Sequence, residues 1–375
     1  MDVSHNPVTV GDQLTDSNRL TELGYSPHWE ALFDEHTQRG LRPGRVIRAD
    51  RGSVLVATEQ GIVRAKPSAR LLKTASGPLD LPGTGDWVAL LAPDDLDVPL
   101  VEAVLDRVSA IVRGDPGGTS VVQVLAANVD IVFVVHPIAQ PPNLRRIERE
   151  LSVAWDSGAR PVVVLTKADL SPDVETAHRK VQDVALGIDV VVTNALAGDG
   201  IEPLIDFIGE HRTAVLIGPS GAGKSTLVNA LLGENRQATR EVRVSDGRGR
   251  HTTVVREVIP LGGGSSVLID TPGLRALGLT GSEDGIASAF PDIEQLAHSC
   301  RFRDCRHVDE PGCAVLAAVE SGVLPHDRLD SFQKLTREAH VVAAKTDARL
   351  RADEDRKSKA ISKAAKEYFQ RFGHK

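Results

Sequence analysis

One segment constrains the fold of this chain more than any other. It reads Gly218-Pro219-Ser220-Gly221-Ala222-Gly223-Lys224-Ser225. An apolar run at 214–217 precedes it, and a stretch with helical spacing, 225–232, follows. A strand, a glycine-rich turn and a helix in this order are the context of a phosphate-binding P-loop, although a glycine-rich turn can also fit the pattern by chance. Backbone amides of the turn and the helix N-terminus favour bound phosphate. We therefore expect a nucleoside triphosphate here, with Lys224 at the β- and γ-phosphates and the Ser225 hydroxyl on Mg²⁺.

The bulk properties are those of an ordinary globular protein. With 375 residues, the chain is long enough for two or three domains with full cores. Its formal charge of −7 means that any surface for nucleic acid has to be local. The first residues lack the basic and apolar segments of a signal peptide, and no apolar run has the length that spans a bilayer. We therefore expect no membrane association.

The region before the P-loop divides into an extension and a barrel. Residues 1–43 are expected to form either one short helix that packs on the body or a partly ordered tail. From 44 to 108, short apolar runs alternate with Gly, Pro and Asp, which predicts an OB-fold-like β-barrel of about five strands. The runs are at 46–47, 54–57, 62–63, 87–91 and 101–104.

The charge of this barrel is uneven. Its first part is basic, and the acids there are Asp50 and Glu59. The basic residues are Arg45, Arg48, Arg51, Arg64, Lys66, Arg70 and Lys73. Trp87 is the only aromatic residue between 44 and 108, so contacts with RNA should be mainly to the phosphates of a structured helix. A barrel that acts only as a scaffold is the alternative.

From 109 to 285, strand-like and helix-like segments alternate, which predicts a mostly parallel sheet covered on both faces. Such a sheet binds its ligand at the carboxyl ends of the strands. The expected strand 161–165 runs into Thr166-Lys167-Ala168-Asp169. A carboxylate at Asp169 can accept hydrogen bonds from guanine N1–H and the 2-amino group, which adenine lacks, so we expect GTP and GDP. The Lys167 stem can cover the purine ring, and Asn194 and Ala195, after the next strand, can contact the base edge.

Two further segments suit the phosphate end of the ligand. Arg248-Gly249-Arg250-His251-Thr252-Thr253 is a polar stretch in which Thr252 or Thr253 can close over Mg²⁺ and the γ-phosphate; the alternative is an ordinary basic loop. Downstream, an apolar run at 267–269 leads into Asp270-Thr271-Pro272-Gly273. This fits a strand that ends in an acid holding Mg²⁺ through water, followed by a glycine whose amide meets the γ-phosphate.

The order of these parts is unusual, because the base-recognition motif precedes the P-loop. The sheet should therefore be circularly permuted. In this order the chain resembles the circularly permuted, small-ribosomal-subunit-dependent GTPases, the RsgA/YjeQ-like ribosome biogenesis family. Other matches are Ala126-Ala127-Asn128-Val129-Asp130 on the expected first strand, Gly218–Thr226, Gly249–Thr253 and Asp270–Gly273, so that the resemblance spans roughly residues 44 to 320.

The resemblance implies GTP hydrolysis during small-subunit assembly, with two departures. Thr166 stands where the family more often has asparagine, and we expect tuned affinity with guanine selectivity retained. Leu274 follows Gly273, where Ras-like enzymes place the glutamine that orients water, so hydrolysis should be slow without a partner. His251, carried over from the family's switch motif, is the candidate replacement; a histidine that packs or contacts RNA is the alternative.

All three cysteines lie close together near the C-terminus, in the pattern Cys300-x4-Cys305-x-His307-x5-Cys313. Three thiolates and an imidazole in a closed set suit one structural Zn²⁺, the same spacing occurs in the resembled family, and free thiols are the alternative. Arg301, Arg303 and Arg306 would make the surface of this region basic. Residues 351–375 are also rich in Lys and Arg, and form either a basic helix for RNA or a solvated helix face.

Together these patterns predict an α/β protein of four segments: an N-terminal extension (1–43), an OB-fold-like barrel (44–108), a circularly permuted P-loop GTPase domain (109–285) and a zinc-binding, mostly helical domain (286–375). The predicted protein is a cytoplasmic monomer that binds the small ribosomal subunit and its rRNA, and couples GTP hydrolysis to late maturation and its own release. One alternative is a zinc-containing RNA-binding module that uses GTP as a slow conformational switch on another RNA. A permuted GTPase with a non-ribosomal target is another.

Overall fold

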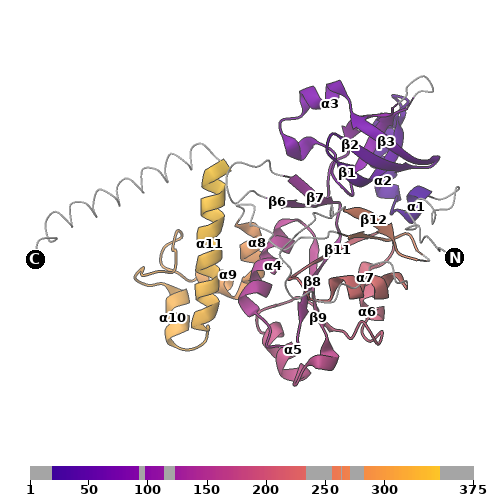
Figure 1. The fold of residues 1–375 in the computed structure, drawn as a ribbon. Coiled ribbons are helices and arrows are strands. Elements are labelled where there is room, and N and C mark those ends of the chain that lie inside the picture. Colours follow the sequence, from indigo (N-terminus) through magenta and orange to yellow (C-terminus); the bar gives the residue numbers. More distant parts are fainter. Residues whose placement is uncertain are drawn as a thin grey trace, which may run out of the picture.

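The computed structural model describes residues 19–92, 98–113, 123–233, 256–262, 264–270 and 283–346. Its parts are a β-barrel, a six-stranded sheet with helices on both faces, and a helical C-terminal region (Figure 1). The predicted site residues His251, Thr252, Thr253 and Gly273 lie outside the described residues, as does the basic segment 351–375.

The barrel is a closed five-stranded one, as the sequence predicts, in the order β1-β2-β3-β5-β4. A parallel contact between β3 and β5 stands among otherwise antiparallel pairs. The strands are β1 (Arg42–Asp50), β2 (Ser53–Thr58), β3 (Gly61–Pro67), β4 (Trp87–Leu91) and β5 (Leu100–Val104), with helix α3 (Ala69–Thr74) and the 3₁₀ turn η2 (Pro78–Asp80) between β3 and β4. Small and β-branched side chains such as Val46, Val56 and Val88 fill its interior.

The N-terminal segment forms two helices, α1 (Arg19–Glu22) and α2 (Pro27–Thr37), where the sequence indicated one at most. The break has a local cause. Gly24 has a left-handed φ of 88°, and Ser26 is extended because the following Pro27 excludes helical backbone before it. The two helices bury Leu20, Trp29 and Phe33 against the barrel residue Trp87.

A two-stranded antiparallel sheet, β6 (Ala110–Arg113) and β7 (Gln123–Ala127), comes between the barrel and the large sheet in the chain. The sequence predicted that Ala126–Asp130 lie on the first strand of the large sheet. That prediction is wrong, because β8, the first strand of the large sheet, begins at Ile131. Ala126 and Ala127 end β7, and Asn128 turns the chain with a φ of 55°. The Asn128 side chain supports this turn, because its oxygen accepts from the Val108 amide at 3.1 Å and its amide group donates to the Gly85 carbonyl at 3.3 Å.

The large sheet has the order β10-β9-β8-β11-β13-β12, and only β12 is antiparallel to its neighbour. Its strands are β8 (Ile131–Pro137), β9 (Arg160–Thr166), β10 (Val190–Val192), β11 (Thr213–Ile217), β12 (Glu257–Pro260) and β13 (Val267–Asp270). Successive residues of one strand point to opposite faces of the sheet and so belong to different cores, as Val134 and Val135 do on β8. A sheet covered on both faces explains why these strands are apolar throughout.

Helices cover both faces of this sheet (Figure 1). Helices α6 (Glu202–Ile208) and α7 (Lys224–Leu232) pack on one face, whereas α4 (Leu144–Asp156) and α5 (Val174–Gln182) contribute to the core of the other. The same second core continues into α8 (Asp284–Ala289), α9 (Pro291–Ala297), α10 (Ala314–Glu320) and α11 (His326–Thr346). The C-terminal helices therefore share a core with the sheet.

A buried arginine joins α11 to the sheet layer. The Arg328 guanidinium donates to Glu148 of α4 at 2.8 Å and to Asp292 of α9 at 2.9 and 3.0 Å. It also lies 4.2 Å from the centroid of the Phe290 ring. Arg328 and Glu148 are 4% and 2% exposed, so water cannot solvate their charges. Hydrogen bonds within the protein have to offset that loss of solvation.

A second buried arginine joins the barrel to the sheet. Arg45 of β1 is 1% exposed; it donates to the Leu23 carbonyl and, at 2.6 Å, to the Thr213 hydroxyl at the start of β11. Burial lowers the pKa of Arg45 to about 10, so it remains a cation at neutral pH. The Asp130 carboxylate accepts from the Thr213 amide at 2.8 Å, close enough for its charge to favour the Arg45 cation.

Candidate functional site

The P-loop runs from the buried strand β11 to helix α7, as its sequence predicts. At Gly218, with a φ of 139°, a Cβ atom would collide with the carbonyl of Val135 on the neighbouring strand, so only glycine fits. Gly223 has a φ of 90° and caps the N-terminus of α7. Ser220, Gly221 and Ser225 are exposed, on the side where phosphate has to arrive.

Lys224, the first residue of α7, turns back over this loop. Its Nζ donates to the Gly218 carbonyl at 2.9 Å and to the Pro219 carbonyl at 2.7 Å. These bonds hold the ammonium group at the mouth of the turn, next to the amides that face incoming phosphate. A phosphate oxygen is a stronger partner for an ammonium group than a neutral carbonyl, so binding of a nucleotide can redirect this side chain at little cost.

The base-recognition residues follow the next two strands of the sheet. After β9, Lys167 has a left-handed φ of 60°, and Ala168–Leu170 form the 3₁₀ turn η3, on which Asp169 is exposed. The amide of Ala168 donates to the carbonyl of Thr193, just beyond β10, at 3.3 Å. Asn194 begins a tight loop in which its amide and carbonyl pair with the backbone of Asp199, both at 3.1 Å. The motifs at 166–169 and 194–195 are therefore adjacent.

Thr166 connects this base-recognition region to the P-loop. It is 2% exposed, and its hydroxyl donates to the Ala222 carbonyl at 2.5 Å. It also packs against Gly223, where an added Cβ would lie 3.5 Å from the Thr166 hydroxyl. The threonine that stands in place of asparagine thus uses its single hydroxyl to link the two halves of the site.

Asp270 completes the described part of the site. It is the last residue of β13, which pairs in parallel with β11 through Val215 and Ile269. The P-loop, Asp270 and the two base-recognition segments therefore all follow the carboxyl ends of parallel strands in one sheet, which is where such sheets bind ligands.

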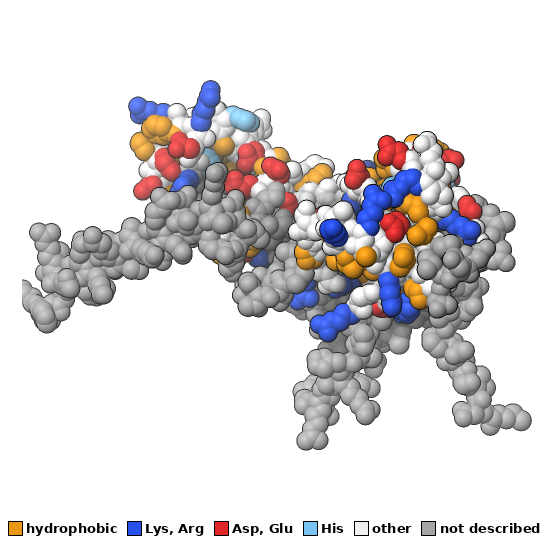
Figure 2. All heavy atoms as spheres, turned by 90° about the horizontal axis from the view of Figure 1, so that it is seen from above, with side chains coloured by type: hydrophobic (Ala, Val, Ile, Leu, Met, Phe, Trp, Pro, Cys, Tyr) orange, Lys and Arg blue, Asp and Glu red, His pale blue; other side chains and the backbone are white. Residues whose placement is uncertain are grey.

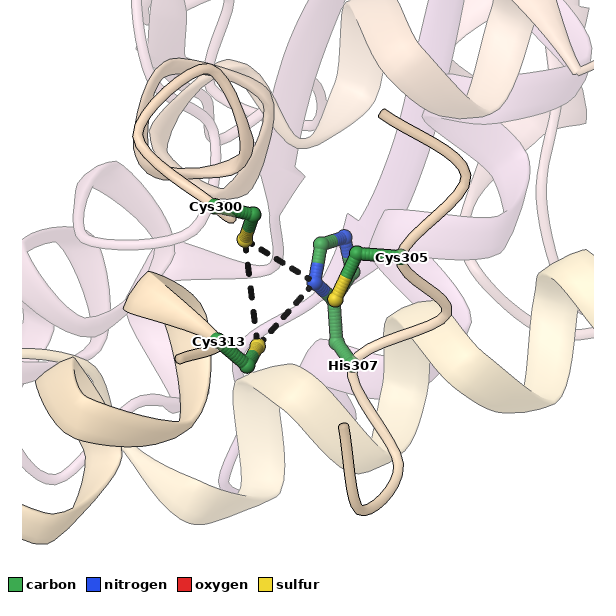
Figure 3. A group of neighbouring side chains, drawn as sticks. All are labelled: Cys300, Cys305, His307 and Cys313. Atoms are coloured by element: carbon green, nitrogen blue, oxygen red, sulfur yellow. Dashed lines mark hydrogen bonds between the residues drawn. The ribbon is translucent and has the colours of Figure 1, made fainter. Parts of the chain in front are cut away.

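The four predicted metal ligands come together at a second place, between α9 and α10 (Figure 3). The ligand atoms of Cys300, Cys305, His307 and Cys313 all lie within 4.8 Å of one another. The sulfurs of Cys300 and Cys313 are 3.9 Å apart, and His307 Nδ1 lies 3.7 Å and 3.4 Å from them. A tetrahedral zinc with Zn–S bonds of about 2.3 Å separates its sulfurs by about 3.8 Å, so the donor set fits this ion.

Comparison with known proteins decides the family. The family model described as RsgA GTPase matches residues 104–280. The chain is 48% identical to the small ribosomal subunit biogenesis GTPase RsgA of Streptomyces avermitilis over 346 residues, which is 92% of each chain. It is 47% identical to the protein of the same name from Streptomyces coelicolor, over 93% of this chain and 95% of that one. This chain belongs to the RsgA GTPase family.

Solved structures agree with this assignment. The chain is similar to YjeQ from Thermotoga maritima, with a TM-score of 0.58 and 27% identity over 80% of this chain and 98% of that one. It also shares its fold with YloQ, described as a circularly permuted GTPase, with a TM-score of 0.56 and 24% identity over 80% and 95%. The predicted permutation is confirmed, and the protein is a GTP-hydrolysing enzyme of this family.

The surroundings of Cys300 and Cys305 shift the pKa values of their thiols in opposite directions. Burial opposes charge on the Cys300 thiol, but hydrogen bonds from the Ala314 and Val315 amides bring its pKa below the usual value. Burial and the neighbouring sulfurs raise the pKa of Cys305 to about 12. Thiolates this close together repel one another, and a bound cation removes that repulsion.

Sequence reasoning did not foresee that Arg45 and Arg328 join separate parts of the fold. Nor did it foresee that Glu310 accepts hydrogen bonds from the backbone amides of Arg306, Val308 and Asp309. Arg45 and Arg328 lie in ordinary strand and helix patterns, and their partners are remote in the chain. Glu310 lies between two metal ligands, His307 and Cys313, and that position is the signal that the sequence offers. Within the described residues, no helix has the length and apolar character that crossing a membrane requires.

Proposed function

We propose that this chain hydrolyses GTP on the small ribosomal subunit and uses the reaction to time its own release late in subunit maturation. The observation that carries the proposal is the hydrogen bond from Thr166 to Ala222, because it joins a guanine-specific loop and a phosphate-binding loop into one site. The ribosomal target is supported by the names of the relatives that share 47–48% identity with nearly the whole chain. We also propose that the protein acts as a monomer in the cytoplasm.

In the proposed site, Asp169 accepts the two guanine donors, Lys167 covers the ring, and Ala168, Asn194 and Ala195 contact the base edge. Residues 218–226 surround the phosphates, through the amides of Gly218, Ser220, Gly221, Ala222 and Gly223 and the side chains of Lys224, Ser225 and Thr226. Pro219 has no N–H to donate and contributes to the shape of the turn. Ser225 and, through water, Asp270 would hold Mg²⁺, which supplies neutralisation of phosphate charge when bound.

The groups that act on the attacking water belong to segments outside the described residues. We keep His251 as the candidate for orienting water, Thr252 or Thr253 for closure over Mg²⁺, and the Gly273 amide for the γ-phosphate. Leu274 has no group that can orient water, so hydrolysis should be slow until the subunit supplies or positions the missing group.

We also propose that Cys300, Cys305, His307 and Cys313 bind one structural Zn²⁺. The supporting observations are the donor distances and the closed set of four ligands, which leaves no open position for catalysis. The ion would stabilise the region from α9 to α10, whose core is continuous with that of the sheet. The division into segments 1–43, 44–108, 109–285 and 286–375 remains part of this proposal.

The surface proposed for rRNA lies on the barrel. Figure 2 shows Lys and Arg side chains over the barrel, with Asp and Glu side chains interspersed among them. The exposed basic residues of its sequence are Arg42, Arg51, Arg64, Lys66, Arg70 and Lys73. Asp50 accepts from Arg48 and Arg64 at 3.0 Å each, which fixes these guanidinium groups on the outer face. Such groups suit phosphate contacts, which position a protein on RNA without reading its sequence.

The decisive experiment measures multiple-turnover GTP hydrolysis with and without purified small ribosomal subunits, with ATP as the control nucleotide. We expect GTP to be preferred and the small subunit to stimulate the rate strongly. Equal use of ATP would refute the role of Asp169. A single turnover without repetition would favour the alternative, an RNA-binding module that uses GTP as a slow switch. Failure to co-sediment with the small subunit would favour another target.

A further inference from the structure

The metal-binding loop is closed by a small number of backbone hydrogen bonds. The amide of Arg301 donates to the carbonyl of Gly312 at 3.1 Å, which brings the two ends of the loop together. Cys313 caps the N-terminus of α10, because its sulfur accepts from the Leu316 amide at 3.4 Å. Between these ends, residues 301–313 contain no helix or strand. The positions of Cys305 and His307 therefore depend on the turn that the loop adopts.

One side chain organises that turn. The Glu310 carboxylate accepts three backbone amides: Arg306 at 2.9 Å on one oxygen, and Val308 at 2.9 Å and Asp309 at 3.2 Å on the other. The three amides come from both sides of His307. A carboxylate that accepts several backbone N–H groups fixes them strongly, because each bond is charge-assisted.

His307 needs this support. Its backbone has a φ of 57°, in the left-handed region that side chains with a Cβ seldom adopt. The conformation points Nδ1 at Cys300 and Cys313 (Figure 3). Gln333 of α11 donates to the His307 carbonyl at 2.5 Å, so the residue is held from a second direction. Strain of this kind persists where neighbouring groups hold the backbone in place.

We propose that Glu310 is a positioning residue of the metal site, which holds the backbone around His307 in its ligating conformation and thereby slows the loss of zinc. This inference rests on the proposed zinc site. Glu310 does not ligate the ion in this arrangement, since its oxygens are occupied by the loop amides. It orients His307 without binding the ion itself, as hydrogen-bonding groups around the ligands do in other metal sites.

A matched control lies one residue away. Asp309 carries the same charge at almost the same distance from His307 in the chain, and it is exposed. If Glu310 acts only by attracting a cation through space, removing the charge at either position should have a similar effect. If it acts through its hydrogen bonds, only Glu310 matters. The pair E310Q and D309N separates these explanations, because each substitution removes one charge and keeps the size of the side chain.

The experiment uses the full chain loaded with zinc and follows transfer of the ion to a chromogenic chelator. Because loss of a supporting group typically costs about 10–100-fold in metal affinity, we expect release from E310Q to be faster by about that factor. D309N should release zinc at the wild-type rate. A second variant, E310D, keeps the charge but is one methylene too short to reach all three amides, so it should also release zinc faster.

Two further measurements make the result specific. Unchanged GDP affinity in each variant shows that the rest of the chain is folded. The visible spectrum of Co²⁺-loaded E310Q should keep the bands of a four-coordinate, thiolate-rich site, because the ligands themselves are unchanged. Release from E310Q or E310D as slow as from D309N would overturn the inference. A wild-type chain that binds no zinc would overturn the proposed metal site itself, and the inference with it.

Discussion

The nucleotide site follows strands that are buried on both faces, whereas the metal site lies in a loop between two short helices. In the first, β8, β9, β11 and β13 bring the binding segments together through sheet hydrogen bonds and apolar packing. In the second, four ligands and the Glu310 carboxylate specify the turn, with few backbone bonds across the loop.

This difference predicts which of the two sites needs its ligand to keep its structure. A parallel sheet with an apolar core has its geometry before any nucleotide binds. The loop that brings three cysteines and a histidine together would gain its stability from the proposed zinc ion, as small metal-binding units generally do. The two sites nevertheless share one core, through which a disturbance could spread from one to the other. The predictions below test how separate they are, in order of decreasing effect.

Removal of zinc should give the largest effect, and a local one. A strong chelator applied to the full chain should reduce hydrogen-exchange protection of amides between 297 and 320 by more than about 1,000-fold. Protection in β8 and β11 should persist, and GDP affinity should change by less than about threefold. Loss of GDP binding on chelation would show that the sheet, too, depends on the ion.

Asp169→Asn should change the nucleotide site and leave the metal site alone. Two charge-assisted hydrogen bonds of about 1.5–3 kcal/mol each are lost, so GDP affinity should fall by roughly 100-fold or more. An asparagine amide can instead donate to the carbonyl that xanthine carries in place of the guanine amine, so XDP binding should improve. Competition between GDP and XDP measures the change in nucleotide preference, and the zinc content of the variant shows whether the metal site is unchanged. A variant that still prefers GDP would remove Asp169 from base recognition.

Arg328→Leu tests the joint between the two regions. It leaves Glu148 buried without its partner, and breaking a buried pair in this way costs about 3–5 kcal/mol. Denaturant unfolding of the variant should show this loss. The control is Arg145→Leu on the same α4–α11 contact, whose pairs with Asp327 and Asp330 are exposed, at 3.1 and 3.7 Å. That change should cost about 1 kcal/mol or less, and equal losses would contradict the argument from burial.

Thr166→Val should have the smallest effect. Valine keeps the shape of threonine but leaves the Ala222 carbonyl without its 2.5 Å partner, which costs about 1–2 kcal/mol and should lower GDP affinity by about tenfold. Thr193→Val is the control, since its hydroxyl makes only a 3.4 Å contact with the Leu165 carbonyl. Equal GDP affinities in the two variants, measured by fluorescence titration, would show that the link does not organise the site.

Much of the fold was predictable because its signals are local. The barrel strands, the P-loop turn and the alternation of strands and helices from β8 to α7 each show in a short window of sequence, and the structure confirms them. Prediction failed where a short apolar stretch could belong to either of two strands. Ala126 and Ala127 read as the start of the apolar strand β8, but Asn128 turns the chain and assigns them to β7. The break between α1 and α2 does have a local signal in the sequence, Pro27, which disfavours helical backbone at Ser26.

The sequence by itself supplied the P-loop motif, the order that implies permutation, and the residues of the two proposed sites, among them Asp169 and the group of three cysteines and His307. The tertiary structure decided what holds these groups in place. Arg45 meets Thr213 across 168 residues, Arg328 meets Glu148 across 180, and Thr166 meets Ala222 across 56. Glu310 has near neighbours as partners, yet its role appears only once the loop has turned. Motifs record which groups react, whereas hydrogen bonds depend on distances that the folded chain alone sets.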